Sequence, residues 1–159
     1  MRDASTAQSA LLGRPGFLIR RLHQIHGYLF ARETAGFAVT PVQYSVMTVL
    51  FEREESDQIT IAREVGLERT TVADVVARLE SRGLVTRHTN SRDQRVRLVR
   101  LSREGRQLVK KMARAVERAH AQTIAPLSPA EQQQLMALLL RMLEANNEVG
   151  NVPFQLSKD

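Results

Sequence analysis

The stretch from Ile59 to Leu101 constrains the fold more than any other part of the chain. Apolar residues recur at helical spacing on both sides of Gly66. This predicts two short helices joined by a tight turn, because glycine adopts a positive φ without steric cost. After Gly83, residues 84–88 and 95–101 alternate or cluster apolar residues as two strands, with turn-prone residues between them. The stretch therefore predicts a helix-turn-helix followed by a β-wing, a pattern suited to entering a DNA groove.

Helical periodicity predicts further elements on both sides of this stretch. A first helix runs from Pro15 to about residue 34, and a second opens at Thr40, where Gln43 completes a capping box. The charged residues 52–58 between the second helix and the helix-turn-helix are interpreted as a loop.

Two more helices follow the wing. Ser102 begins a long helix that extends to about Ile124. A second capping box, Ser128 with Glu131, opens the last helix, in which leucines and methionines recur.

A chain of 159 residues favours one compact domain or two closely packed lobes. We expect a mainly α fold with a small β-wing (α+β), with residues 1–14 as a mobile arm, 15–148 as the domain and 149–159 as a tail. Residues 40–101 would form the winged lobe. Residues 15–36 and 102–148 would supply helices whose broad apolar stripes predict burial against a second copy in a homodimer.

The positive charge of the chain is confined to one segment. Residues 78–106 hold nine arginines and three acids, an excess equal to the formal net charge of +6, and no lysine. The planar guanidinium donates paired hydrogen bonds to phosphates and base edges. Because the excess is confined to a predicted hairpin beside a helix-turn-helix, it favours nucleic acid as the partner over a merely solvated surface.

Other functional classes find little support in the residues. There is no cysteine, which excludes disulfides, thiolate metal sites and thiol-based redox sensing. No apolar run reaches membrane-spanning length and the N-terminus is polar, so we expect a cytoplasmic protein without a membrane partner. A nucleophile elbow, a glycine-rich phosphate loop and a metal-ligand cluster are absent from the sequence, so we expect neither an enzyme nor a cofactor.

Two binding alternatives stay open at this point. One is a ligand-independent architectural DNA-binding protein, which would share the basic wing but discriminate little between sequences. The other is a protein–protein module that reuses a winged helix, against which the arginine excess argues.

The chain resembles the MarR family of bacterial winged helix-turn-helix regulators. Three segments carry the resemblance: residues 65–72, residues 79–85, and residues 92–95 continuing into 98–105. It extends from Pro15 to about Asn147 and implies an obligate homodimer on a palindromic double-stranded operator. The resemblance also implies a small-molecule pocket between the dimer helices and the winged lobe, where ligand usually weakens DNA binding.

The exposed N-terminal half of the second helix of the motif carries the candidate base contacts. Arg69 can donate to guanine, and Thr70 and Thr71 can bond phosphate or touch a thymine methyl. Asp74 can accept from cytosine, and Arg78 is a further candidate DNA contact. An ion pair between Asp74 and Arg78, one turn apart, is the alternative.

The wing tip carries a second group of candidates. By resemblance, Arg95 enters the minor groove and Asp93 orients it, and a narrow groove has the negative potential that attracts arginine. Arg92 and Arg97 are expected to contact phosphates. The alternative is that these are solvated hairpin charges.

His23 and His26 share one face of the first helix, with Arg20 one turn earlier. Zinc is one interpretation, although two histidines without clear carboxylate partners are a thin ligand set. Packing without a special role is another. A third is a pocket for a small aromatic carboxylate that meets Arg20 or a histidine, with a hydroxyl from Tyr44. Residues 17–26 are similar to a family branch linked to aromatic-acid catabolism, including nicotinate breakdown.

Overall fold

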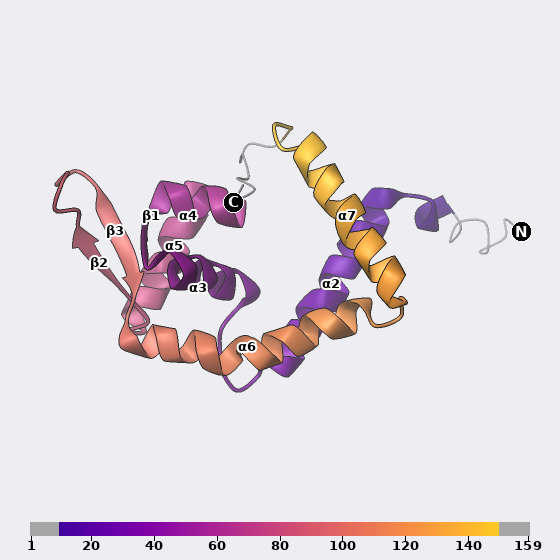
Figure 1. The fold of residues 1–159 in the computed structure, drawn as a ribbon, viewed down its shortest axis with the longest axis horizontal. Helices are drawn as coiled ribbons and strands as arrows, with labels where there is room; N and C mark the ends of the chain where they lie inside the picture. The colour runs from indigo at the N-terminus through magenta and orange to yellow at the C-terminus, as the bar shows by residue number, and fades with distance from the viewer. Residues whose placement is uncertain (1–9, 150–159) are drawn as a thin grey trace, which may run out of the picture.

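The computed structural model, which describes residues 10–149, has a winged lobe and a helical lobe joined by one long helix (Figure 1). In chain order its elements are α2 (Pro15–Glu33), α3 (Pro41–Arg53), β1 (Glu55–Asp57), α4 (Gln58–Val65), α5 (Arg69–Ser81), β2 (Val85–Thr89), β3 (Arg97–Leu101), α6 (Arg103–Ile124) and α7 (Pro129–Ala145). This confirms the predicted class, mainly helical with a small wing. Residues 10–12, in the predicted arm, form a helical turn. Residues 1–9 of that arm and residues 150–159 of the tail lie outside the described residues.

The helix starts follow the capping pattern of the sequence. The Gln43 amide donates to Thr40 Oγ1 at 3.2 Å, and the Thr40 amide donates to Gln43 Oε1 at 3.1 Å. Ser128 and Glu131 form the second predicted box at the start of α7. Ser102 caps α6 through its hydroxyl, which accepts from the Gly105 amide. Each cap satisfies backbone donors that the first helical turn cannot pair.

The interpretation of residues 52–58 as a loop is wrong. Residues 55–57 form β1, which pairs antiparallel with β3, and the sheet order is β1-β3-β2. Three residues are too few to show strand alternation, and only Ser56 of the three is buried. The edge of β3, more than 40 positions later in the chain, induces this strand by tertiary pairing, which local propensity does not reveal.

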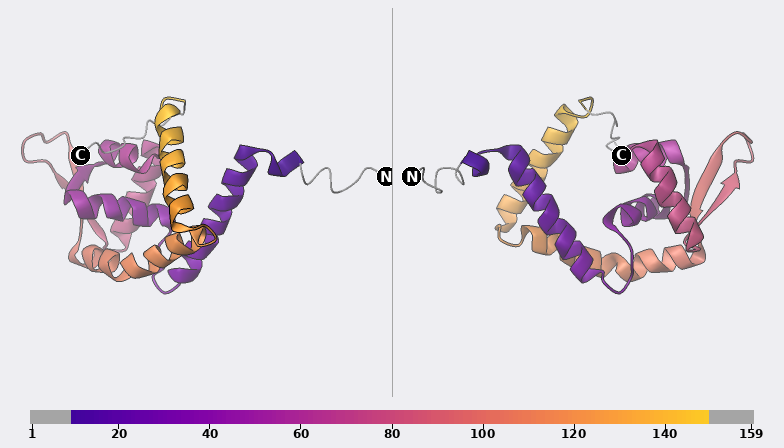
Figure 2. Two further views of the ribbon diagram at one scale, coloured as in Figure 1. Left: turned by 45° about the vertical axis from the view of Figure 1, so that its right-hand side comes forward. Right: turned by 180° about the vertical axis from the view of Figure 1, so that it is seen from behind.

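The helix-turn-helix itself matches the prediction. Gly66 ends α4 in the left-handed region at φ 66°. The hairpin between β2 and β3 is closed by the Asn90 amide, which donates to the Val96 carbonyl, so the second strand begins at Arg97 rather than Arg95. In Figure 2 this hairpin projects away from the rest of the winged lobe.

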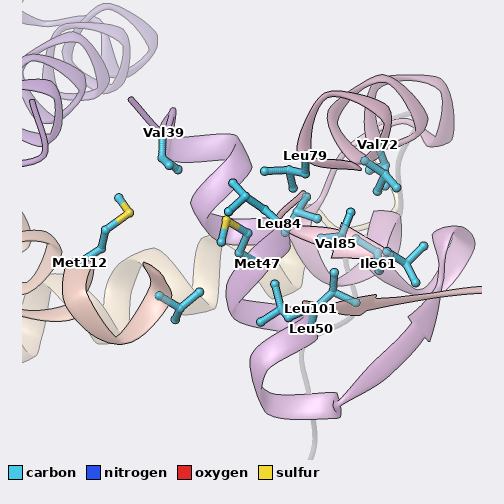
Figure 3. Close-up of a cluster of buried hydrophobic side chains, with 14 of the residues drawn as sticks. Val39, Met47, Leu50, Ile61, Val72, Leu79, Leu84, Val85, Leu101 and Met112 are labelled. Carbon is cyan, nitrogen blue, oxygen red and sulfur yellow. The ribbon is translucent and has the colours of Figure 1, made fainter. Parts of the chain in front are cut away.

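The core of the winged lobe is mainly aliphatic (Figure 3). The core lies where α3, α4 and α5 pack on the sheet. One face of α5, the second helix of the motif, is buried in it. Side chains with 0–1% exposure in this core are Val46, Met47, Leu50, Ile61, Val72, Val76, Leu79, Val85 and Val99.

The helical lobe is less complete. Met112, Ala115 and Ala119 of α6 are buried, and α2 packs along this helix. Yet α7 has no buried residue in the single chain. Large apolar side chains with 39–52% exposure lie on α2 and α7, namely Leu18, Ile19, Leu22, Ile25, Met136, Leu138, Leu139, Leu140, Met142 and Leu143.

The first turn of α6 makes a tight contact with Leu84, the residue just before β2. A Cβ placed on Gly105 would lie 2.1 Å from the Leu84 carbonyl oxygen and 3.1 Å from a methyl of Leu101. Real Cβ atoms do not approach a backbone oxygen so closely. Only glycine therefore allows the first turn of α6 to pack here.

Replacing Gly105 with alanine should therefore destabilise the protein. Because a backbone atom is in the way, the first turn of α6 must shift, and the expected loss in the free energy of unfolding is about 1–3 kcal/mol. Urea unfolding at fixed protein concentration measures it. The matched control is Gly36→Ala, where nothing lies within 4 Å of the added Cβ, so the change should stay within about 0.5 kcal/mol. Equal effects of the two substitutions would contradict the close-contact account.

Candidate nucleic-acid interface and effector site

The second helix of the motif, α5, presents the predicted base-contacting residues together. Arg69, Thr70, Thr71, Asp74 and Arg78 are all exposed, while the opposite face of the helix is buried in the core. Within residues 10–149 none of these five side chains has a hydrogen-bonding or ionic partner. The face is therefore available for an outside partner.

The alternative role for Asp74 does not occur in the single chain. Asp74 and Arg78 lie one turn apart, but no ion pair joins them, and Asp74 has no other charged partner in the described part of the chain. The Asp74 carboxylate is thus an exposed acceptor within an otherwise basic face.

A hollow of about 660 Å³ opens between the start of α4, the start of α5 and the wing. Arg69, Arg95 and Arg97 line it, which brings predicted contacts from the helix and the wing to one concavity. Arg87, which the sequence did not single out, lines it too and forms an ion pair with Glu80, with Arg87 Nε 3.1 Å from the carboxylate. The other lining residues are Asp57, Gln58, Ile59 and Val96.

The acidic residue in this hollow is already engaged by the fold. Asp57 Oδ1 accepts from the amides of Ile59 at 2.9 Å and Thr60 at 3.0 Å, and Oδ2 accepts from the Thr60 hydroxyl at 2.7 Å. Burial opposes ionisation of this carboxyl, but hydrogen bonds from Thr60 and the nearby amides outweigh it and hold the pKa of Asp57 below its ordinary value. Its charge stabilises the α4 N-terminus, while the arginines around it stay free of it.

At the wing tip, Asp93 acts on the backbone. Its Oδ1 accepts from the Arg95 amide at 2.9 Å, and the Val96 amide donates to the Asp93 carbonyl at 3.0 Å. The contact that resemblance implied, in which Asp93 orients Arg95, is therefore one with the main chain of Arg95. The guanidinium of Arg95 is exposed, as are the side chains of Arg92 and Arg97.

Not every arginine of the basic segment faces this hollow. Arg82 donates to two backbone carbonyls of the turn between α2 and α3, and the guanidinium of Arg106 lies 5.8 Å from the centre of the Phe51 ring. Counting charge along the sequence cannot separate these arginines from their neighbours, because their partners lie 44 or more residues away.

The predicted effector residues are only partly brought together. His26 is partly buried, with its ring stacked on His120 at 4.7 Å between centroids and 25° between planes. Tyr44 meets Phe30 edge-on at 6.2 Å, and Phe30 lies 6.4 Å from His26. Arg20 instead packs over Phe17, and His23 is exposed. An apolar hollow of about 300 Å³ lies beside Phe30, at the end of α2.

His26 also contacts Thr123, whose hydroxyl lies 2.8 Å from His26 Nδ1 and 2.8 Å from the Ala119 carbonyl. Burial, followed by the nearby rings of His120 and His23, lowers the pKa of His26. His120 and Thr123 lie on α6, and no local signal in the sequence links them to His26.

Further bonds connect α2 to α6 in the same region. Glu33 accepts from Arg118 Nε at 2.9 Å and from Gln122 Nε2 at 3.0 Å. These hydrogen bonds, that of Arg118 first, lower the pKa of Glu33. In the part of the chain that the structure describes, no three His, Cys, Asp or Glu side chains are grouped so as to hold a metal ion.

This architecture and its sequence are similar to those of known proteins. A model of the MarR family matches residues 39–97. The putative transcriptional regulatory protein for the hcr operon of Thauera aromatica is 30% identical over 146 residues, which are 91% of this chain and 88% of that protein.

Two solved structures share both the fold and part of the sequence. PcaV of Streptomyces coelicolor, a transcriptional regulator in complex with its natural ligand, has 34% identity and a TM-score of 0.77 over 85% of this chain and 95% of its own. BpsR of Bordetella bronchiseptica, whose DNA binding is regulated by 6-hydroxynicotinic acid, has 28% identity and a TM-score of 0.79 over 82% and 93%.

The fold and its arginine-lined face define a winged helix-turn-helix protein of the transcription-regulator class. The chain belongs to the MarR family. Its relatives act as regulators and not as enzymes. None of the helices among residues 10–149 combines the length and apolar character that crossing a bilayer requires.

The lowered pKa of His26 predicts a pH-dependent stability. Unfolded His26 binds a proton near pH 6.5, where the folded ring still resists protonation, so the free energy of unfolding should fall as the pH drops below about 6.5. Urea unfolding at pH 7.5 and pH 5.5, at one protein concentration, measures the fall. In His26→Gln the fall should be smaller, with the remaining histidines as an internal control. Parallel pH dependences of the two proteins would contradict this assignment.

Proposed function

We propose that the chain is a ligand-responsive, homodimeric repressor that binds a palindromic operator and is released by a small aromatic acid. The observation that carries the DNA-binding part is the hollow in which Arg69 of α5 and Arg95 and Arg97 of the wing meet. A helix and a basic ribbon on one face match a major groove and its adjacent minor groove. Arginines at phosphates release counterions, which supplies affinity.

The unpartnered apolar surface of the helical lobe supports the dimer. α7 has no buried residue, and the exposed leucines and methionines on α2 and α7 are too many for a stable single chain in water. In this proposal residues 15–36 and 102–148 bury these faces against a second copy. Two winged lobes of residues 40–101 then lie about 34 Å apart, one helical turn of DNA.

The region around His26 supports the effector part. Apolar walls with a few convergent polar groups suit an aromatic ring with one carboxylate. His26, Phe30 and Tyr44 form such a wall. Arg20 and His23, on the adjacent turns of α2, would have to bind the carboxylate of this ligand. The likeness to PcaV with its ligand, and to BpsR with its aromatic acid, favours the branch linked to aromatic-acid or nicotinate catabolism.

A ligand-independent architectural protein is the alternative. It would use the same arginines but show a small ratio between specific and random affinity. A competition titration between a sequence selected from a random library and random DNA of equal length separates the two proposals. Strong preference for the selected sequence supports a regulator, and near-equal affinity supports the architectural alternative.

Replacing Arg95 with alanine should weaken binding to the selected operator at least ten-fold, because a groove contact is worth about 1–3 kcal/mol. A gel-shift titration at fixed salt measures it. Arg92→Ala is the matched variant on the same wing. As a phosphate contact it should weaken operator and random DNA equally and reduce the salt slope by about 0.9 for each copy, or about 1.8 for the dimer. Unchanged operator affinity in Arg95→Ala would refute the minor-groove role.

The effector proposal predicts that calorimetry detects binding of at least one compound in a panel of benzoates, hydroxycinnamates, their CoA thioesters and hydroxynicotinates. The corresponding neutral amide should bind more weakly, because it lacks the carboxylate that Arg20 would meet. Arg20→Met should therefore lower affinity for the acid and leave the weak affinity for the amide unchanged. If no acid in the panel binds, the aromatic-carboxylate effector is wrong.

A further inference from the structure

The C-terminal end of α5 is tied to the turn between α2 and α3 by one side chain. Arg82 is the C-cap residue of α5. Its Nη1 donates to the Ala38 carbonyl at 2.7 Å, and its Nη2 lies 3.4 Å from the Phe37 carbonyl, to which it also donates. The planar guanidinium matches two successive carbonyls because its donors form a fixed fork. The contact joins residues 44 and 45 positions apart in the chain.

The turn that receives these hydrogen bonds has an unusual backbone. Ala38 has φ 51°, in the left-handed region that residues with a Cβ rarely adopt. Such a conformation persists where the surroundings fix it. Here Val39 is buried on one side, and the Phe37 amide donates to the Thr34 carbonyl at 3.0 Å on the other. The hydrogen bonds from Arg82 to the carbonyls of Phe37 and Ala38 hold the backbone of this turn from a third direction.

The other long helix holds the same end of α5. The Ser102 hydroxyl donates to the Gly83 carbonyl at 2.7 Å, and the Ser102 amide donates to the Leu84 carbonyl at 3.0 Å. Ser102 is the N-cap of α6. The chain at residues 82–84 is therefore bound both to the turn that follows α2 and to the start of α6.

The opposite end of α5 is held by packing, because Val72 is fully buried in the core, and in the described part of the chain no side-chain hydrogen bond fixes it as Arg82 fixes the C-terminal end. Glu68, its N-cap residue, makes no capping hydrogen bond with its side chain. At 1.5 Å per residue the helix of 13 residues is roughly 20 Å long. A change of angle at the Arg82 end is therefore carried along this length to Arg69 and Thr70.

We infer that Arg82 is a positioning residue, which sets the angle of α5 against the turn that follows α2. It thereby links the helical lobe to the reading face, the exposed side of α5 that carries Arg69, Thr70, Thr71, Asp74 and Arg78. This inference rests on the proposed DNA binding. Arg82 differs from Arg78 one turn earlier, because each Nη of its guanidinium already donates to a backbone carbonyl of the chain. If α2 moves, the turn at residues 34–40 moves with it. The Arg82 side chain, which is bonded to this turn, transmits that movement to α5.

The test compares operator binding, random-DNA binding and salt dependence in the full-length protein. The variants are Arg82→Met, which removes the fork, and Arg82→Lys, which keeps the charge without the paired donors. Arg78→Met is the matched control on the same helix. Positioning predicts that both Arg82 variants lose several-fold affinity for the selected operator, with random-DNA affinity and salt slope unchanged. Arg78→Met should instead weaken both DNAs and reduce the slope by about 0.9 for each copy, or about 1.8 for the dimer.

Hydrogen exchange provides a readout without DNA. The Phe37 amide should exchange faster in Arg82→Met and at the wild-type rate in Arg78→Met, while circular dichroism shows the fold of both. The inference is overturned if Arg82→Met weakens both DNAs equally with a smaller slope and Arg82→Lys restores them, or if exchange at Phe37 does not change. If the wild-type protein shows no preference for a selected sequence over random DNA, the proposed function itself is refuted. Hydrogen exchange at the Phe37 amide would still test the contact between Arg82 and the turn at Phe37 and Ala38.

Discussion

The approach of the first turn of α6 to the end of α5 is the contact on which the arrangement of the two lobes depends. Gly105 leaves room for the Leu84 carbonyl, and Ser102 bonds both Gly83 and Leu84. A side chain at position 105 would push the long helix away and open this junction. Because α6 carries α2 along its far half (Figure 1), the position of the helical lobe relative to the reading face follows from this junction and from the Arg82 contact.

The distribution of partners among the arginines explains how one basic segment serves both structure and recognition. Arg82 and Arg106 are engaged within the chain, while Arg69, Arg95 and Arg97 line an open hollow. An exposed guanidinium is well solvated, so leaving it unpaired costs little stability. The same group gains affinity when it displaces counterions from a phosphate. The one acid deep in the hollow, Asp57, is occupied with capping α4.

Much of this could be read from the sequence because its signals are local. The capping boxes at Thr40 and Ser128, the glycine turn at Gly66 and the apolar face of α5 each depend on residues within one or two turns. What the sequence could not reveal depends on distant partners. Strand β1 forms only because β3 pairs with it, and His26 meets His120 and Thr123 from another helix. Arg82 looks like its basic neighbours until the turn at Ala38 is placed beside it.

The central claim is that two copies of this reading face act together on one side of DNA. Hydroxyl-radical footprinting of the full-length protein, on an operator selected from a random library, tests it most directly. The account predicts two protected half-sites of related, inverted sequence, with centres about one helical turn, or 10 base pairs, apart. A single protected block without an inverted partner would contradict the account.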